Sequence, residues 1–243
     1  MEEHRKPVVL VVDDETDLRD SIAFDFKRKG YETLCASGGH EALEIIKKQK
    51  VDLIITDVNM PEGNGVELLR KAKEIDPEIP VVIFITGFAD LTSAEAYDFG
   101  AVAVMSKPFD RKKLHETAKR GLLARAQAWA GEEPPPVENR REIQISAPVE
   151  FGQGGAFVPM DQELPAVGDI IRFKVELSQE SGTTPVSGTG VVLWARARAE
   201  DGRSAGFGIE FLTVDQAARE QIISAVKAKR VKAFIPLGPS RTP

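Results

Sequence analysis

Cysteine is almost absent from this chain of 243 residues. The single one is Cys35, so no disulfide can form within the chain and a reducing compartment is favoured. Cys35 lies in an apolar, strand-like segment, and we therefore expect a buried, unreactive thiol.

Long hydrophobic runs are also missing. The apolar run Val8–Val12 ends at Asp13 and Asp14, so it is too short for the core of a signal peptide or for a membrane span. We therefore expect a cytoplasmic protein without membrane insertion. Its 42% of hydrophobic residues is ordinary for a globular chain, and its length fits one or two domains.

The chain also lacks an excess of positive charge. The formal net charge is −6, which argues against general nucleic-acid binding. Basic residues outnumber acidic ones from Thr213 onward, although a short basic stretch at the end of a helix also complements the helix dipole. The second half offers one helix and no helix-turn-helix pattern, which disfavours a transcription factor.

The N-terminal half contains a regular alternation of two patterns. Short apolar segments alternate with segments whose apolar residues recur at helical spacing, such as Leu18, Ile22 and Phe26. The expected strands are residues 8–12, 31–35, 51–56, 81–85 and 101–104. Five strand-helix repeats predict an α/β domain with a five-stranded, parallel, doubly wound sheet.

The last helix of this half should begin after Asp110, a good N-cap residue. No strong breaker apart from Gly121 interrupts the segment from Arg111 to Ala130. We therefore predict a long helix whose apolar stripe either forms a homodimer with a second chain or lies on a second domain.

A proline linker separates the two halves. Pro134-Pro135-Pro136 cannot be helical and predicts a stiff spacer. Beyond it the apolar period changes to two residues, as in Phe207, Ile209 and Phe211, which predicts a small antiparallel β-barrel.

A C-terminal helix is expected to close the barrel. It should begin at Thr213, which with Gln216 forms a capping-box pattern. The predicted divisions of the chain are a first domain at 1–130, a linker at 131–141, a second domain at 142–232 and a disordered tail at 233–243.

The strand at 51–56 ends by presenting Asp57. Ligands bind at the carboxyl ends of parallel strands, but a carboxylate there can also merely cap a turn, and this segment alone leaves both readings open. Further polar residues follow the other strands: Asp13, Asp14, Thr86 and Lys107. We expect them to converge with Asp57 on one edge of the sheet.

Such a cluster calls for a hard cation. Carboxylates about 4 Å apart repel by about 4 kcal/mol per pair at an effective dielectric constant of 20. Mg²⁺ prefers oxygen ligands and leaves coordination places for water and a phosphoryl oxygen. Asp57 could then accept a phosphoryl group as an acyl phosphate, with Lys107 and Thr86 contacting its oxygens.

These residues occur in motifs that resemble a two-component response-regulator receiver domain. Residues 7 to about 125 carry, in the family's order and spacing, Val-Val-Asp13-Asp14-Glu, Thr-Asp57-Val-Asn-Met-Pro61, Ile-Thr86-Gly-Phe and Ser-Lys107-Pro108-Phe. The resemblance implies a CheY-like, flavodoxin-like fold. It also implies phosphorylation by a sensor histidine kinase.

The family's site residues carry over by position. The resemblance implies that Asp57 is the phospho-acceptor, and that Asp14 and Asp57 bind Mg²⁺ with the backbone carbonyl of Asn59, assisted by Asp13. Thr86 and Lys107 would report the arrival of the phosphoryl group.

Three further positions bear on tuning and switching. Asn59 and Phe88 occupy the positions that tune dephosphorylation in the family. Val104 stands where receivers commonly have an aromatic switch residue, which puts the family's usual coupling in doubt.

The second half resembles a PilZ domain, a small β-barrel that in many proteins binds cyclic di-GMP. The resemblance rests on segments such as Gly190-Val191-Val192-Leu193-Trp194 and the strand Gly206–Phe211. The family's spaced arginines are reduced to Arg140 and Arg141, and its Asp/Asn-x-Ser-x-x-Gly motif aligns best with Glu150–Gly155, which keeps only the final glycine.

The leading prediction is a phosphorylation-controlled signalling protein whose divergent PilZ-like domain acts by contact with an unknown downstream protein. The alternative is a cyclic di-GMP effector that recruits the dinucleotide through Arg140 and Arg141. No catalytic constellation follows Pro136, so we expect no enzyme beyond a receiver that catalyses its own phosphoryl transfer and dephosphorylation.

Overall fold

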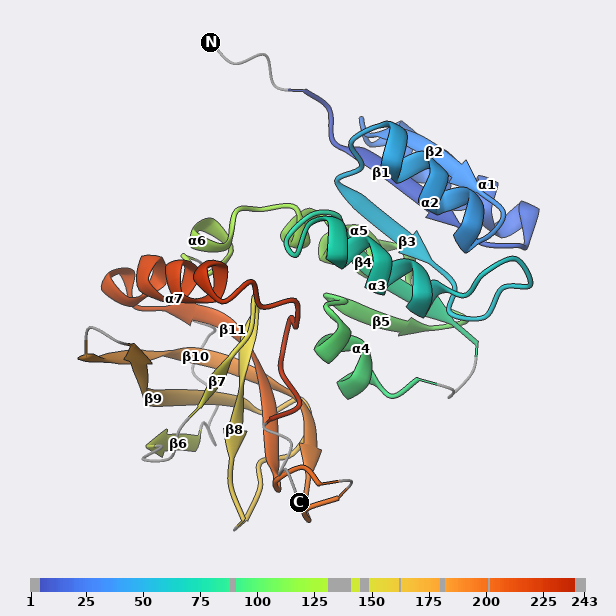
Figure 1. The fold of residues 1–243 in the computed structure, drawn as a ribbon. Helices are drawn as coiled ribbons and strands as arrows, with labels where there is room; N and C mark the ends of the chain where they lie inside the picture. The colour runs from blue at the N-terminus through green and yellow to red at the C-terminus, as the bar shows by residue number, and fades with distance from the viewer. Residues whose placement is uncertain are drawn as a thin grey trace. The chain divides into compact units, whose positions relative to one another are not determined.

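The computed structural model describes residues 5–87, 91–130, 141–144, 149–161, 163–179, 182–200 and 202–238. Contacts divide the chain into two compact units, one of Met1–Thr92 and Phe99–Leu122 and the other of Ser93–Asp98 and Leu123–Pro243. Each unit has its own sheet (Figure 1). No helix in the described ranges is both long and apolar enough to cross a membrane.

The first sheet has five parallel strands in the order β2-β1-β3-β4-β5. The strands are β1 (Val8–Val12), β2 (Glu32–Ala36), β3 (Leu53–Thr56), β4 (Val81–Thr86) and β5 (Ala103–Ser106). The helices between and after them are α1 (Thr16–Arg28), α2 (Gly39–Lys48), α3 (Gly65–Ile75), α4 (Ser93–Phe99) and α5 (Arg111–Gly121). Every residue of β1, β3 and β4 is buried, as in a sheet covered on both faces, and the α/β prediction is confirmed.

Helix α5 begins as predicted but ends early. The Asp110 carboxylate accepts hydrogen bonds from the backbone N–H groups of Lys112 and Lys113. The helix stops at Gly121, a poor helix former, and a separate short helix, α6, spans Arg125–Ala128. The prediction of one helix through to Ala130 is therefore wrong, and the homodimer prediction loses the long stripe on which it rested.

The second sheet has six strands in the order β6-β9-β10-β11-β8-β7. These are β6 (Arg141–Gln144), β7 (Glu150–Phe151), β8 (Gly155–Pro159), β9 (Ile170–Gln179), β10 (Gly182–Arg196) and β11 (Gly206–Val214), followed by helix α7 (Gln216–Ala228). Neighbouring strands are antiparallel except for the parallel pair β6 and β9. Phe173, Phe207 and Phe211 form its core with Ala218 and Ile222 of α7. The sequence predicted a small antiparallel β-barrel closed by a C-terminal helix; the mainly antiparallel sheet and the helix are confirmed, whereas β6 and β9 pair in parallel.

Two local predictions are wrong. Thr213 does not cap the last helix, because its hydroxyl bonds across the sheet to the backbone N–H of Thr189 at 3.1 Å and to the Thr189 hydroxyl at 2.8 Å. Asp215 takes the N-cap position instead, and its carboxylate accepts a hydrogen bond from Ser187. Cys35 is exposed, because the edge strand β2 pairs only with β1 in the described residues.

Residues 231–238, which follow α7, are placed by the structure although the sequence predicted a disordered tail from residue 233. Within the segment 231–238, here called the strap, Phe234, Ile235 and Leu237 are buried. The Leu237 carbonyl accepts a hydrogen bond from the Arg196 guanidinium at 2.7 Å. Burial of apolar side chains therefore overrides the disorder predicted from residue 233; residues 239–243, and the linker apart from Arg141, lie outside the described ranges.

Helix α5 carries a histidine, His115, that packs against helix α1. The His115 ring packs on Phe26 of α1, with ring centroids 4.1 Å apart. Burial, helped by the positive charges of Lys29 and Arg111, lowers the pKa of His115, and Asp25 opposes this shift. Folding therefore favours the neutral ring.

We predict that the free energy of unfolding falls as the pH falls through about 6.5, where the histidine of the unfolded chain takes up a proton first. The loss should stay well below about 1.4 kcal/mol, because the ring is only half-buried. Urea unfolding at pH 7.5 and 5.5 measures it. His115→Gln should reduce the difference, whereas the exposed His40→Gln should not; equal pH dependence in all three proteins would contradict the prediction.

Candidate functional site

The register of the first sheet brings the predicted residues to one edge. Val12 pairs with Thr56, so Asp13 and Asp57 follow neighbouring strands, and the backbone N–H of Asp57 donates to the Val12 carbonyl at 3.0 Å. On the next strands Thr86 pairs with Ser106, and the N–H of Lys107 donates to the Thr86 carbonyl at 2.8 Å. The backbone thereby fixes where each side chain starts.

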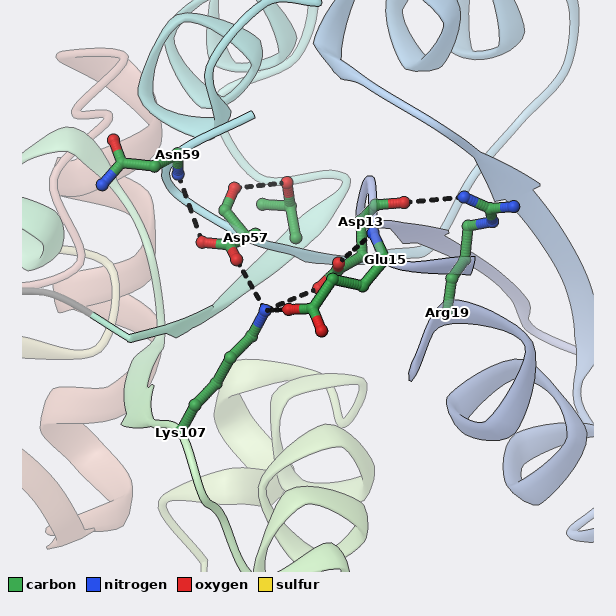
Figure 2. A network of polar contacts seen from close by, with 7 residues as sticks. Asp13, Glu15, Arg19, Asp57, Asn59 and Lys107 are labelled. Atoms are coloured by element: carbon green, nitrogen blue, oxygen red, sulfur yellow. Dashed lines mark hydrogen bonds and ion pairs between the residues drawn. The ribbon is translucent and has the colours of Figure 1, made fainter. Parts of the chain in front are cut away.

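Lys107 is the centre of this edge (Figure 2). Its Nζ lies 2.7 Å from Asp57 Oδ2, 3.1 Å from Asp13 Oδ2 and 3.0 Å from Glu15 Oε1. Burial lowers the pKa of Lys107, but the hydrogen bonds to these carboxylates outweigh burial and raise it on balance. The ammonium group is therefore charged at neutral pH and neutralises part of the acidic cluster.

The second carboxylate oxygens of Asp13 and Asp57 are also hydrogen-bonded. Asp57 Oδ1 accepts from the backbone N–H of Asn59 at 3.1 Å, and Asp13 Oδ1 accepts from that of Glu15 at 2.9 Å (Figure 2). Burial raises the pKa of Asp13, and the bonds from Glu15 and Lys107 work against that shift. The two buried carboxylates are thus fixed in orientation by main-chain donors.

Asp13, Asp14 and Asp57 make a plausible donor set for a divalent cation. One carboxylate oxygen from each lies within 4.8 Å of the others, and Asp14 is exposed whereas Asp13 and Asp57 are buried. Oxygen ligands of this charge suit a hard ion such as Mg²⁺. The observed cluster therefore fits the metal that the sequence predicts.

Two of the three remaining predicted receiver residues lie within the described ranges. Thr86 is buried at the end of β4, and Val104 is half-buried in β5, in register with Phe84. Phe88 lies outside the described residues. Glu15 had no predicted role, although it comes directly after the aspartate pair at the same strand end.

In the second unit, the turn after β7 is covered by the strap. The backbone N–H groups of Gln153 and Gly154 donate to the carbonyls of Ala233 and Phe234, both at 2.9 Å. A Cβ on Gly154 would lie 1.9 Å from the Phe234 ring, so only glycine fits there. This turn is where the sequence placed the weak dinucleotide motif; Arg140 and the side chain of Arg141 lie outside the described residues.

Comparisons with known proteins match both units. The response regulator receiver domain family matches residues 9–119, and the PilZ domain family matches residues 140–228. Sporulation initiation phosphotransferase F of Bacillus subtilis (strain 168) is 34% identical over 115 residues, which are 47% of this chain and 92% of that protein. The chain belongs to the response-regulator receiver family, and it consists of a receiver domain followed by a PilZ domain.

Two further comparisons show how much of this chain and of each relative is matched. The DNA-binding transcriptional regulator NtrC of Bradyrhizobium sp. (strain RP501 Parasponia) is 30% identical over 198 residues, 80% of this chain but 38% of that protein. A receiver domain protein (CheY-like) from Methanospirillum hungatei JF-1 has a solved structure with 33% identity and a TM-score of 0.46, over 49% of this chain and 94% of that one. The chain thus spans well under half of the NtrC regulator.

Gly65 gives a direct test of how the backbone positions Asp57. A Cβ on Gly65 would lie 2.1 Å from the Asp57 carbonyl oxygen. We predict that Gly65→Ala lowers the free energy of unfolding in urea by about 1–3 kcal/mol, because the backbone that carries Asp57 must move. Gly87→Ala is the control, since nothing lies within 4 Å of its Cβ position, and it should change stability by less than about 0.5 kcal/mol. Equal effects of the two substitutions would contradict the prediction.

Proposed function

We propose that this response regulator accepts a phosphoryl group on Asp57 from the phosphohistidine of a sensor histidine kinase. A carboxylate oxygen of Asp57 attacks phosphorus, the P–N bond breaks, and the electron pair of that bond leaves with the histidine. The product is an acyl phosphate on Asp57. The observation that carries the proposal is the pairing of Lys107 with both Asp57 and Asp13 at the carboxyl end of the sheet.

Mg²⁺ belongs to this proposal. Asp13, Asp14, Asp57 and the backbone carbonyl of Asn59 would hold the ion, which supplies neutralisation of the charge that develops on the transferred group. Lys107 contributes a second positive charge to Asp13 and Asp57. The backbone N–H of Asn59 orients Asp57 through its bond to Oδ1.

Phosphorylation would change the partners of Lys107. The phosphoryl group of the acyl phosphate carries about −1.5 to −2 charges at neutral pH, which is more than the single carboxylate charge that it replaces. Lys107 would turn toward it and release Glu15, whose exposed side chain has the least to hold it. The Thr86 hydroxyl would donate a hydrogen bond to a phosphoryl oxygen. Because Val104 stands in β5 where receivers commonly have an aromatic residue, the change at Thr86 would reach the surface of β5 without the family's aromatic switch.

The output of the PilZ domain is, in this proposal, a contact with a downstream protein. The strap supports this, because Phe234 fills the space over Gly154 that a ligand of the weak dinucleotide motif would need. The reduced arginine segment at Arg140 and Arg141 supports it as well, since guanidinium groups are the usual clamps for phosphates. Membership of the PilZ family is the one observation that favours the alternative, a cyclic di-GMP effector.

Labelling with acetyl phosphate tests the acceptor. Wild-type protein should incorporate phosphate in the presence of Mg²⁺, and Asp57→Asn should lose at least about 90% of the signal because the nucleophilic oxygen is gone. Asp20→Asn, a substitution on the exposed face of α1, is the matched control and should label like wild type. Equal labelling of Asp57→Asn and Asp20→Asn would remove Asp57 as the acceptor.

Calorimetric titration with cyclic di-GMP tests the output. We expect no binding at micromolar concentrations to either the unphosphorylated or the beryllofluoride-treated full chain, since the strap covers the glycine turn. Dissociation constants below 1 μM, about −8 kcal/mol or tighter, would establish the alternative function instead.

A further inference from the structure

The second unit contains a groove that the proposed phosphorylation chemistry does not use. It has a volume of about 390 Å³ and lies between β7, β9, α7 and the strap. Its apolar wall includes Phe151, Leu177, Val226 and Pro236, and its charged side chains are Glu150, Glu176 and Lys229. A groove of this size and lining suits a few side chains of an extended segment.

One wall of the groove is the edge of a sheet. Strand β7 is the last strand in the sheet order, and among the described residues it pairs only with β8. In the turn just beyond it, the N–H groups of Gln153 and Gly154 bond to carbonyls of the strap. A second segment of backbone therefore already lies along the chain at the end of β7.

The charges of the groove favour a cationic occupant. Two carboxylates, Glu150 and Glu176, line it against one ammonium group, Lys229. Glu150 is half-buried; that burial first, and then the negative charge of Asp98, raise its pKa, while the charge of Lys229 opposes the shift, and its carboxylate has no hydrogen bond or ion pair within the described part of the chain. A cation placed beside Glu150 would offset the loss of hydration.

We propose that this groove docks an extended segment of a partner protein, with apolar side chains at alternate positions and a lysine or arginine that pairs with Glu150. Its backbone would add to the free edge of β7, as in other cases of strand addition. The inference rests on the proposed output by protein contact and names the chemistry of the partner. The apolar residues enter between Phe151, Leu177 and Val226.

A random dodecapeptide display library selected on the full chain supplies the probe. We expect selected peptides to alternate apolar residues and to carry one lysine or arginine. For a synthetic copy of the strongest peptide, Glu150→Gln should weaken binding about tenfold or more, because a charge-assisted hydrogen bond is lost. Glu142→Gln, an exposed carboxylate on β6, should leave the affinity unchanged.

Exchanging the charges of Glu150 and of the peptide's basic residue distinguishes a lost ion pair from a misfolded variant. Glu150→Lys should lose the basic peptide and bind the same peptide with glutamate at its basic position, which an unfolded variant cannot do. A tenfold gain in affinity on removing residues 239–243 would show that the chain's own tail is the occupant, and would overturn the proposal. Peptides without a basic residue, or equal binding by wild type and Glu150→Lys, would overturn it too.

A pull-down separates this inference from the function on which it rests. If a beryllofluoride-dependent partner binds wild type and Glu150→Lys equally, output by protein contact is supported and the groove is not the docking site. If cyclic di-GMP binds below 1 μM and no such partner is found, the proposed output itself fails.

Discussion

A single ammonium group organises the acidic edge of the receiver. Lys107 contacts carboxylates that follow two neighbouring strands, Asp13 and Asp57, and reaches Glu15 in the turn beyond. Without a cation these carboxylates would repel one another, so the cluster depends on charge brought from β5, a different part of the sheet. Additional negative charge on Asp57 would compete with Asp13 and Glu15 for the Lys107 ammonium group. Phosphorylation of Asp57 would therefore change the contacts of residues that follow the neighbouring strand.

Much of the arrangement at this edge can be predicted from the sequence, because parallel strands bring the residues at their carboxyl ends together. Buried strands read as unbroken apolar runs, and their carboxyl ends meet, so the convergence of Asp13, Asp57 and Lys107 needs no knowledge of side-chain positions. Glu15 could not be assigned in this way, since it lies three residues past the end of β1 and its side chain points to Lys107. The roles of these residues in phosphoryl transfer stay predictions; the structure contributes their geometry.

At Thr213 and in the strap, tertiary contacts override the pattern of the local sequence. Thr213 has the sequence of a helix cap, but a buried partner on the adjacent strand, Thr189, takes its hydroxyl. Phe234 and Leu237 are buried although no periodicity in their segment marks them as core; Phe234 packs on Gly154, and the backbone N–H of Leu237 donates to the Asp98 carboxylate at 2.9 Å. That strap covers the turn where the sequence placed a dinucleotide and makes one wall of the groove that we propose for a peptide.

The most direct measurement locates the phosphoryl group itself. Protein treated with acetyl phosphate and Mg²⁺ is reduced with borohydride, which converts an aspartyl phosphate into homoserine, and the modified residue is then found by mass spectrometry of its peptides. The proposed chemistry predicts homoserine at position 57 and at no other carboxylate of the cluster. Modification of Asp13, Asp14 or Glu15 in its place, or of none of them, would contradict it.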